Sequence, residues 1–178
     1  MSIDCAQAPA SPLMRQIIRV ESSGNPFAIG VVGRSLQRQP RNAVEAIATA
    51  KMLETRGFNY SIGMGQVNKV HFSRLGWDRD LLKGFDDCQN ILAATGILAA
   101  CRSRAVKAGF SESADITSAD GVSASASDAA ALSCYYSGDL RAGTRLGYTA
   151  KVLRGTSMPG AFARSGTTSN NETLMMAD

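Results

Sequence analysis

Apolar residues recur at helical spacing along most of this chain, and this periodicity constrains its fold more than any other feature. Only residues 58–68, FNYSIGMGQVN, combine alternation, aromatic and β-branched residues and two glycines, which predicts a short strand or hairpin. The sequence therefore predicts an α+β fold that is predominantly α. The predicted helices are Ser11-Pro12 to Gly24-Asn25-Pro26, Asn42–Gly57, Lys69–Gly76, Cys88 to about Ala108, Asp128 into residues 131–139, and Tyr148–Arg154.

Polar residues mark several of the predicted helix starts. Asn42 stands three residues before Glu45, which is the spacing of a capping box. Asp87 and Asp128 are predicted to cap the two later helices. Residues 111–127 read as a loop rich in Ser, Ala and Asp. We expect one domain over residues 1–154 and a disordered tail over 155–178, because the tail is rich in Gly, Ser, Thr and Asn.

Composition and charge exclude several classes of protein. The 178 residues carry a net charge of +4 that is spread along the chain, and no block of Lys and Arg interleaves with aromatic residues as in nucleic-acid binders. No apolar run reaches the roughly 18 residues that span a membrane. Residues 1–5 lack both the basic start and the apolar stretch of a signal peptide. The chain is therefore expected to be cytosolic or a mature form without its leader.

Four cysteines bear on whether the chain is cytosolic or a mature form without its leader. They are Cys5, Cys88, Cys101 and Cys134. Cys88 and Cys101 share one predicted helix and would lie about 20 Å apart, whereas a disulfide needs Cα atoms within about 7 Å. Two pairings remain: Cys5–Cys88 with Cys101–Cys134, or Cys5–Cys101 with Cys88–Cys134. Four buried free thiols are the alternative. With one histidine, His71, and no CxxC motif, no metal site is expected.

One acidic residue lies on the apolar face of the first predicted helix. Glu21 follows Ile17 by four residues and Ile18 by three, so the three side chains share a face. A carboxylate that loses its water favours the neutral form, and a carboxylic acid so placed can donate a proton in catalysis. The alternative is an exposed glutamate at a frayed helix end.

Two further stretches carry candidate binding groups. In GMGQVN, residues 63–68, small residues let a ligand approach the backbone, and the Gln66 amide can bind sugar hydroxyls or an N-acetyl group. In ALSCYYSG, residues 131–138, two tyrosines end a helix at a tight turn, where one hydroxyl can hold a carboxyl group and one ring can stack on a sugar. A bulged hairpin and core aromatic residues are the structural alternatives.

The motifs ESSGNP (21–26), GMGQ (63–66) and CYYSG (134–138) occur in this order and resemble those of the soluble lytic transglycosylases, goose-lysozyme-like enzymes that cleave peptidoglycan. The family pattern is Glu-Ser-x-x-Asn-Pro, Gly-Leu-Met-Gln and Ala-Tyr-Asn-Ala-Gly. This chain keeps Gly63, Gln66, Tyr135 and Gly138 of the last two motifs, and its departures include Gly65 and Tyr136. NPFAIGVVG, GxGQxN and FDDCQN resemble the branch from type IV secretion and conjugation systems, typified by the first virB operon product. The resemblance covers about residues 13–154.

The resemblance implies a lysozyme-like fold with two lobes, a sugar cleft and a small β element beside it. It implies that Glu21 is the catalytic acid and that Tyr135 orients it. The product would be a 1,6-anhydromuramoyl end, formed without a cofactor and without a second carboxylate. Asp139 is the nearest other acid to the motifs and is expected to cap a turn. The expected substrate-binding residues are Ser22, Gly63, Met64, Gln66, Asn68 and Tyr136.

The expected partners are peptidoglycan strands and type IV secretion components, with no nucleic acid and no stable membrane insertion. The expected location is the periplasm. A lysozyme-type hydrolase and a non-catalytic peptidoglycan-binding module remain the alternatives. His71 is expected to be an exposed helix residue, and Trp77 to pack at the edge of a lobe.

Overall fold

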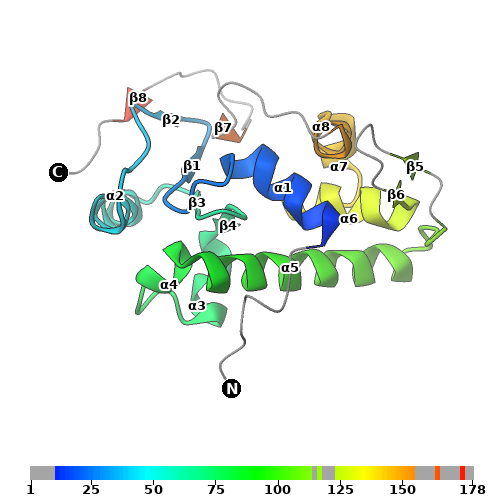
Figure 1. Ribbon diagram of the computed structural model, residues 1–178, viewed down its shortest axis with the longest axis horizontal. Coiled ribbons are helices and arrows are strands. Elements are labelled where there is room, and N and C mark those ends of the chain that lie inside the picture. Colours follow the sequence, from blue (N-terminus) through cyan, green and yellow to red (C-terminus); the bar gives the residue numbers. More distant parts are fainter. Residues whose placement is uncertain (1–10, 114–115, 118–122, 155–162, 165–172, 175–178) are drawn as a thin grey trace. The chain divides into compact units, whose positions relative to one another are not determined.

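The computed structural model describes residues 11–113, 116–117, 123–154, 163–164 and 173–174. The described residues within Met1–Val20 and Ala94–Ser157 form one compact unit, here unit 1, and those within Glu21–Ala93 and Met158–Asp178 form unit 2. The boundary between the units falls inside two helices, α1 (Pro12–Ser22) and α5 (Asp87–Lys107) (Figure 1).

Unit 2 contains a small sheet with the strand order β4-β3-β1-β7, together with short helices. Strand β1 pairs antiparallel with β3, so that Ile29 lies opposite Ile62, and it pairs parallel with β7. Strands β2 and β8 form a separate parallel pair. The strands are β1 (Ile29–Val32), β2 (Ser35–Leu36), β3 (Tyr60–Ile62), β4 (Val67–Asn68), β7 (Ala163–Arg164) and β8 (Thr173–Leu174); the helices are α2 (Ala43–Thr55), the 3₁₀ helix η1 (Lys69–His71), α3 (Phe72–Leu75) and α4 (Leu82–Phe85).

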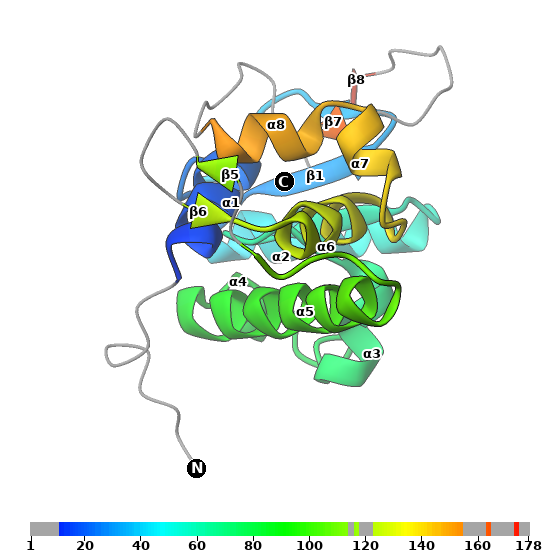
Figure 2. The same cartoon turned by 90° about the vertical axis from the view of Figure 1, so that its right-hand side faces the viewer.

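Unit 1 is mainly helical. Its short helices α7 (Ala142–Arg145) and α8 (Tyr148–Leu153) both pack against α6 (Ala126–Ser137) (Figure 2). A two-stranded antiparallel sheet, β5 (Ile116–Thr117) with β6 (Ser123–Ala124), precedes α6. Together the two units confirm the predicted fold class, a predominantly helical α+β chain with a small β element.

The periodicity located most long helices correctly, and the structure corrects two of the predicted caps. Asp87 is itself helical, and the carboxylate of Asp86 accepts the backbone N–H of Gln89 at 2.9 Å. Ser125, not Asp128, caps α6, and Asp128 is the acidic partner in a complete capping box. In both cases the cap lies one to three residues earlier than predicted, because several Ser and Asp residues compete at each helix start.

The structure adds elements that the sequence reading missed. Strands β1 and β2 follow the first helix within NPFAIGVVGRSL, and the four-residue helices α4 and α7 were also not predicted. Each contains too few residues to show a period. The predicted single helix over residues 69–76 consists of η1 followed by α3 and ends at Gly76, which has a φ of 72°. The predicted hairpin over residues 58–68 is confirmed as β3 and β4.

A disulfide joins Cys101 on α5 to Cys134 on α6, with Cα atoms 5.7 Å apart. This selects one of the two predicted pairings and excludes Cys5–Cys101 with Cys88–Cys134. Cys88 is also disulfide-bonded, whereas Cys5 lies outside the described residues. The cysteines of the described chain are therefore cross-links and not buried thiols.

The predicted tail falls mostly on residues that the structure does not describe; within it, only β7 and β8 are described.

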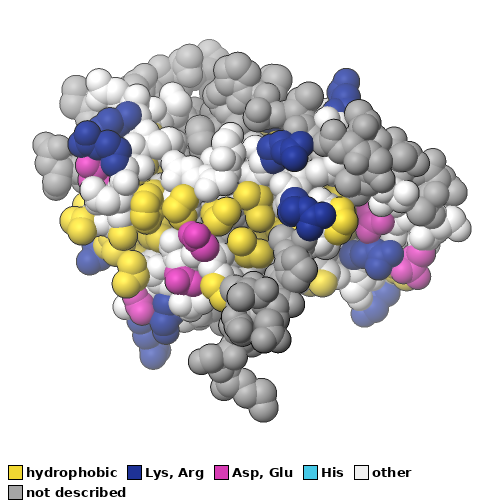
Figure 3. Space-filling model, viewed as in Figure 1, with side chains coloured by type: hydrophobic (Ala, Val, Ile, Leu, Met, Phe, Trp, Pro, Cys, Tyr) yellow, Lys and Arg dark blue, Asp and Glu magenta, His cyan; other side chains and the backbone are white. Residues whose placement is uncertain are grey.

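On the face shown in Figure 3, Lys and Arg side chains lie in several separate groups, as the mild and dispersed charge indicated. No helix among the described residues combines the length and apolar character that crossing a bilayer requires. Trp77 is 2% exposed and its ring lies 5.7 Å from that of Phe72, which confirms that it packs.

Candidate active site

Glu21 lies in the last turn of α1 and is only 4% exposed. Met14, Ile17 and Val20 of the same helix are fully or almost fully buried, so the carboxylate continues a buried face. The structure thus confirms the predicted burial of Glu21 and rules out an exposed glutamate at a frayed end. Glutamate is almost never buried to this extent, so its position makes Glu21 a candidate functional residue.

The turn after Glu21 is fixed by its own polar groups. The Asn25 side chain accepts the backbone N–H of Phe27 at 2.9 Å, and the backbone N–H of Asn25 donates to the carbonyl of Ser22 at 3.0 Å. Ser22 is fully buried, and its hydroxyl donates to the carbonyl of Met64 at 2.8 Å. The ESSGNP motif is therefore tied directly to the GMGQ motif within unit 2.

Gly63–Gln66 forms a tight loop between β3 and β4. The backbone of Gly63 has a φ of 75°, and a Cβ there would collide with the Asn90 amide and lie 2.6 Å from the carbonyl of Gly84. Only glycine fits this position. Gln66 is 2% exposed, and its side-chain amide donates to the carbonyls of Ala28 at 3.0 Å and Gly63 at 2.9 Å. The Gln66 side chain thus closes its own loop and binds it to the start of β1.

Backbone strain marks the same two motifs. Among the described residues, Ser23 (φ 55°) and Gln66 (φ 51°) are the non-glycine residues with positive φ. Such conformations are uncommon outside glycine, and they persist where the surrounding structure enforces them, often at functional sites. Their positions in ESSGNP and GMGQ agree with the motifs that the sequence singled out.

Asn90 is a supporting residue that sequence reasoning missed. It is fully buried on α5, donates to the carbonyls of Ile62 at 3.0 Å and Gly84 at 2.7 Å, and accepts the N–H of Gly65 at 2.7 Å. These bonds hold the residue before the GMGQ loop and Gly65 within it. The available signal was an amide at position 90 on the helix face that also carries the buried residues Ala94, Ile97 and Cys101.

Asn68 follows the loop and caps η1. Its side-chain oxygen accepts the N–H of Val70 at 3.1 Å, and its amide donates to Asn59 at 2.9 Å and Ser61 at 3.2 Å. Met64 is half-buried. For both residues, contact with a substrate stays a prediction.

Tyr135 and Tyr136 lie near the end of α6 in unit 1. Tyr135 is 8% exposed. The Tyr136 ring stacks on that of Tyr148, with centroids 4.5 Å apart and planes 19° apart. Tyr148, which the sequence reading did not single out, therefore covers one face of Tyr136. Helix α6 ends at Gly138, with a φ of 78°.

Asp139 behaves as the turn cap that we predicted. One of its carboxylate oxygens accepts the backbone N–H groups of Arg141 at 2.8 Å and Ala142 at 2.6 Å. These hydrogen bonds, with smaller contributions from the charges of Arg145 and Arg141, hold the pKa of Asp139 below its usual value. The carboxylate is thus fixed in its ionised form at the start of α7.

The structure brings together six of the eight predicted site residues in unit 2, namely Glu21, Ser22, Gly63, Met64, Gln66 and Asn68. Tyr135 and Tyr136 belong to unit 1, and their pairing with Glu21 stays a prediction. The described part of the chain holds no cluster of three or more His, Cys, Asp or Glu side chains of the kind that binds a metal ion.

Comparison with known proteins shows the family of this chain. Residues 3–152 match the family described as the transglycosylase SLT domain. The chain is also 40% identical, over 140 residues, to proteins named "Type IV secretion system protein virB1" from Brucella abortus, Brucella melitensis and Brucella suis. The aligned region is 78% of this chain and 53% of those proteins, so the chain spans about half the length of the curated relatives it matches. No solved structure gives a significant match.

The Glu21 carboxyl group is buried at the end of α1, and the next residue, Ser22, binds the glycine-rich loop, in a chain whose residues 3–152 match this family. The chain belongs to the transglycosylase SLT domain family.

Proposed function

We propose that this protein is a peptidoglycan lytic transglycosylase that cleaves the β-1,4 bond between N-acetylmuramic acid and N-acetylglucosamine. The observation that carries the proposal is the burial of Glu21 directly before a turn that Ser22 ties to the Gly63–Gln66 loop. A module that only binds peptidoglycan has no need of a carboxyl group removed from water, since burying a charge costs free energy.

In the proposed reaction, Glu21 acts twice. Its carboxylic acid protonates the glycosidic oxygen, and the bond from that oxygen to C1 of the muramoyl residue breaks. The carboxylate then takes the proton of the C6 hydroxyl of the same sugar while that oxygen attacks C1. A 1,6-anhydromuramoyl end forms, Glu21 regains its proton, and no water is consumed. The C6 hydroxyl competes well with water because it is tethered to the reacting ring.

Tyr135 is proposed to orient the Glu21 carboxyl group. Gly63, Met64, Gln66, Asn68, Ser22 and Tyr136 are proposed to line the sugar site. Given their hydrogen bonds to backbone groups, Ser22 and Gln66 contribute mainly by fixing the loop that the sugar would touch. We do not assign Asp139 the role of a water-activating carboxylate, since one of its oxygens caps the turn before α7.

We further propose that this activity opens the cell wall locally for a type IV secretion or conjugation apparatus in the periplasm. The relatives from Brucella carry the name of a type IV secretion protein. The Cys101–Cys134 disulfide supports an oxidising compartment, since such bonds are rare in the cytosol.

The first test replaces the proton donor. Glu21→Gln keeps the shape of the side chain and removes its transferable proton, so clearing of purified peptidoglycan should fall by about 10²-fold or more. Glu112→Gln, at a side chain that is 57% exposed, is the matched control and should clear peptidoglycan normally. A folded Glu21→Gln protein with near-normal activity would contradict the assignment.

Product analysis separates the two enzymatic functions. Mass spectrometry of digested peptidoglycan should find muropeptides that are one water lighter than lysozyme products and lack a reducing end. A digest with mainly reducing muramic acid ends would instead establish a lysozyme-type hydrolase.

A further inference from the structure

Unit 2 contains a hollow that the proposed mechanism does not use. Its volume is about 690 Å³, which is within the range of small-ligand pockets. It lies among α2, the first residue of β3, the η1–α3 segment and residues 78–82, and it is called here the α2 pocket. No residue of the ESSGNP or GMGQ motif lines it.

The inner wall of the α2 pocket is rigid and largely apolar. Tyr60 is 1% exposed, and its ring packs edge-on against Phe72 with centroids 5.8 Å apart. Burial, together with the charge and hydrogen bonding of Glu54, raises the pKa of Tyr60 and keeps its hydroxyl protonated. Lys69 binds the two Glu54 oxygens at 3.2 and 3.3 Å, so these two charges neutralise each other.

The rim of the pocket carries charges of both signs that remain available. Lys51, Asp78 and Arg79 line the hollow, and none of them forms an ion pair within the described chain. Leu82, also on the rim, is 53% exposed. Asp80 also lines the hollow and lies 3.9 Å from Lys83. An occupant that complements the remaining charges has carboxylates for Lys51 and Arg79, an amine for Asp78, and small apolar groups.

We propose that the α2 pocket binds the peptide stem that the glycan strand carries. This inference rests on the proposed function, because the stem is bonded to the muramoyl residue of the same polymer. A wall stem is a short peptide with alanine methyl groups, free carboxylates and, in many walls, the amine of a diamino acid. Lys51 and Arg79 bind its carboxylates, Asp78 binds its amine, and the wall of Tyr60 and Phe72 receives its apolar groups.

The distance along the fold suits a stem. Strand β3 runs from Tyr60 in the pocket wall to Ile62, directly before Gly63 of the proposed sugar-binding loop. At about 3.3 Å per residue, Tyr60 and Gly63 lie about 10 Å apart. An extended peptide of four residues spans at most about 14 Å. A stem attached to a sugar beside Gly63 is therefore long enough to reach the pocket.

The experiment compares two substrates and two double variants of the full chain. The substrates are glycan strands with their stems and the same strands after an amidase has removed the stems. Lys51→Ala with Arg79→Ala removes the two rim cations. Arg56→Ala with Lys107→Ala removes two exposed cations outside the pocket and serves as the matched control. A parallel NMR titration adds a synthetic wall tetrapeptide containing a diamino acid.

The wild-type protein and the control should cleave stem-bearing strands with a kcat/KM about three- to tenfold above that for stripped strands. The rim variant should lose most of this preference but cleave stripped strands normally, and the tetrapeptide should shift resonances of Tyr60 and Phe72. Equal cleavage of both substrates by the wild-type protein, or equal behaviour of the rim variant and the control, overturns the pocket assignment. If neither strand is cleaved, the proposed function fails, and the tetrapeptide titration alone decides whether the pocket binds stems.

Discussion

At the scale of single residues, Asn90 is the side chain on which the candidate site most depends without belonging to a motif. It makes three hydrogen bonds from a fully buried position, to Ile62, Gly84 and Gly65. Its amide also occupies the space that a side chain at position 63 would need. Removing it leaves buried carbonyl and N–H groups unsatisfied, which is more costly than losing an exposed hydrogen bond.

We predict that Asn90→Ala lowers the free energy of unfolding by about 2–4 kcal/mol and reduces peptidoglycan clearing, because the loop over residues 63–66 loosens. Urea denaturation measures the first effect. Gln89→Ala is the control, since Gln89 is the exposed neighbour on the same helix. Equal stability of the two variants would show that the loop does not depend on Asn90.

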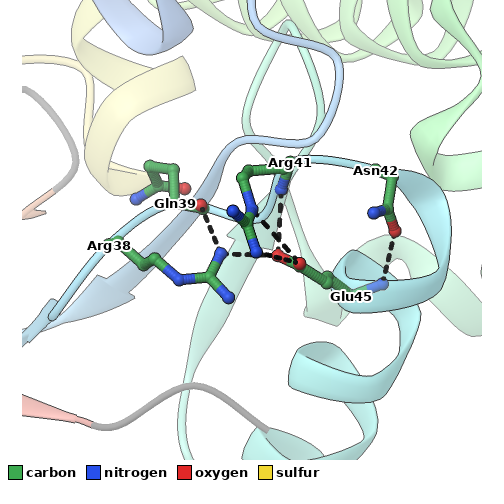
Figure 4. A network of polar contacts seen from close by, with 5 residues as sticks. All are labelled: Arg38, Gln39, Arg41, Asn42 and Glu45. Atoms are coloured by element: carbon green, nitrogen blue, oxygen red, sulfur yellow. Dashed lines mark hydrogen bonds and ion pairs between the residues drawn. The ribbon is translucent and has the colours of Figure 1, made fainter. Parts of the chain in front are cut away.

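Glu45 is a second residue whose contacts can be measured, because they change the pKa of its carboxyl group. Its carboxylate receives hydrogen bonds from the Arg38 side chain and from the backbone and side chain of Arg41, as Figure 4 shows. Asn42 caps the helix by accepting the Glu45 N–H at 3.0 Å, so only half of the predicted capping box forms. The Arg38 side-chain bond, then the Arg41 N–H, lower the pKa of Glu45 to about 2.

Because the pKa of Glu45 is lower in the folded than in the unfolded chain, its stabilising effect is complete above pH 4.5 and is lost as the pH falls toward 2. The stability difference between the wild type and Glu45→Gln should therefore shrink over this window in urea titrations. By NMR, Arg38→Ala should raise the Glu45 titration midpoint and Arg56→Ala should not. A midpoint near 4.5 in the wild-type protein would rule out this network.

At the scale of elements, helix α6 is defined by its first residues. The Ser125 hydroxyl accepts the N–H of Asp128 at 3.0 Å, and the Asp128 carboxylate accepts the N–H of Ser125 at 3.0 Å. Asp128 also binds Arg102 of α5 at 2.9 Å. The box thus sets where α6 begins and joins it to α5. Tyr135 lies two turns further along the same helix.

Ser125→Ala should destabilise the protein by about 0.5–2 kcal/mol, because the backbone N–H groups of Ser125 and Asp128 lose the reciprocal hydrogen bonds of the capping box. Thermal unfolding measures the change. Ser123→Ala, at an exposed serine two residues earlier, is the control and should leave the midpoint unchanged. A Ser125→Ala variant that unfolds at the control temperature would show that Asp128 and Arg102 hold the helix start unaided.

At the scale of the whole molecule, cross-links limit the unfolded chain. The Cys101–Cys134 bond closes a segment with a sequence separation of 33 residues, which includes the described strands β5 and β6. By loop-closure entropy, a bond over such a segment stabilises a folded chain by roughly 3–4 kcal/mol. The same segment contains all of the residues 111–127 that the sequence predicted as a loop.

Replacing both cysteines, Cys101→Ala with Cys134→Ala, should lower the free energy of unfolding by up to this roughly 3–4 kcal/mol and leave the fold intact. Urea denaturation at constant pH measures it. Thiol titration of the unfolded, unreduced wild-type protein should find fewer than four free thiols. Four free thiols, or unchanged stability in the double variant, would contradict a structural disulfide.

Local sequence determined the features that depend on neighbours along the chain. The position of Glu21 on the face of Ile17 and Ile18, the end of α1 at the Gly24-Asn25-Pro26 turn, the Asn42 cap and the hairpin over residues 58–68 all follow from short-range spacing and capping chemistry. The motifs around Glu21, Gln66 and Tyr135 identified the family for the same reason, since each is a short contiguous pattern.

Tertiary structure decided what depends on residues far apart. Nothing within AIGVVG shows that Ile29 pairs with Ile62, because strand pairing needs a partner that local periodicity does not specify. The roles of Ser22 and Asn90 emerge only when α1 and α5 meet the Gly63–Gln66 loop inside unit 2. The choice of Cys134 for Cys101 likewise required the two helices side by side, since four cysteines in sequence fix no pairing.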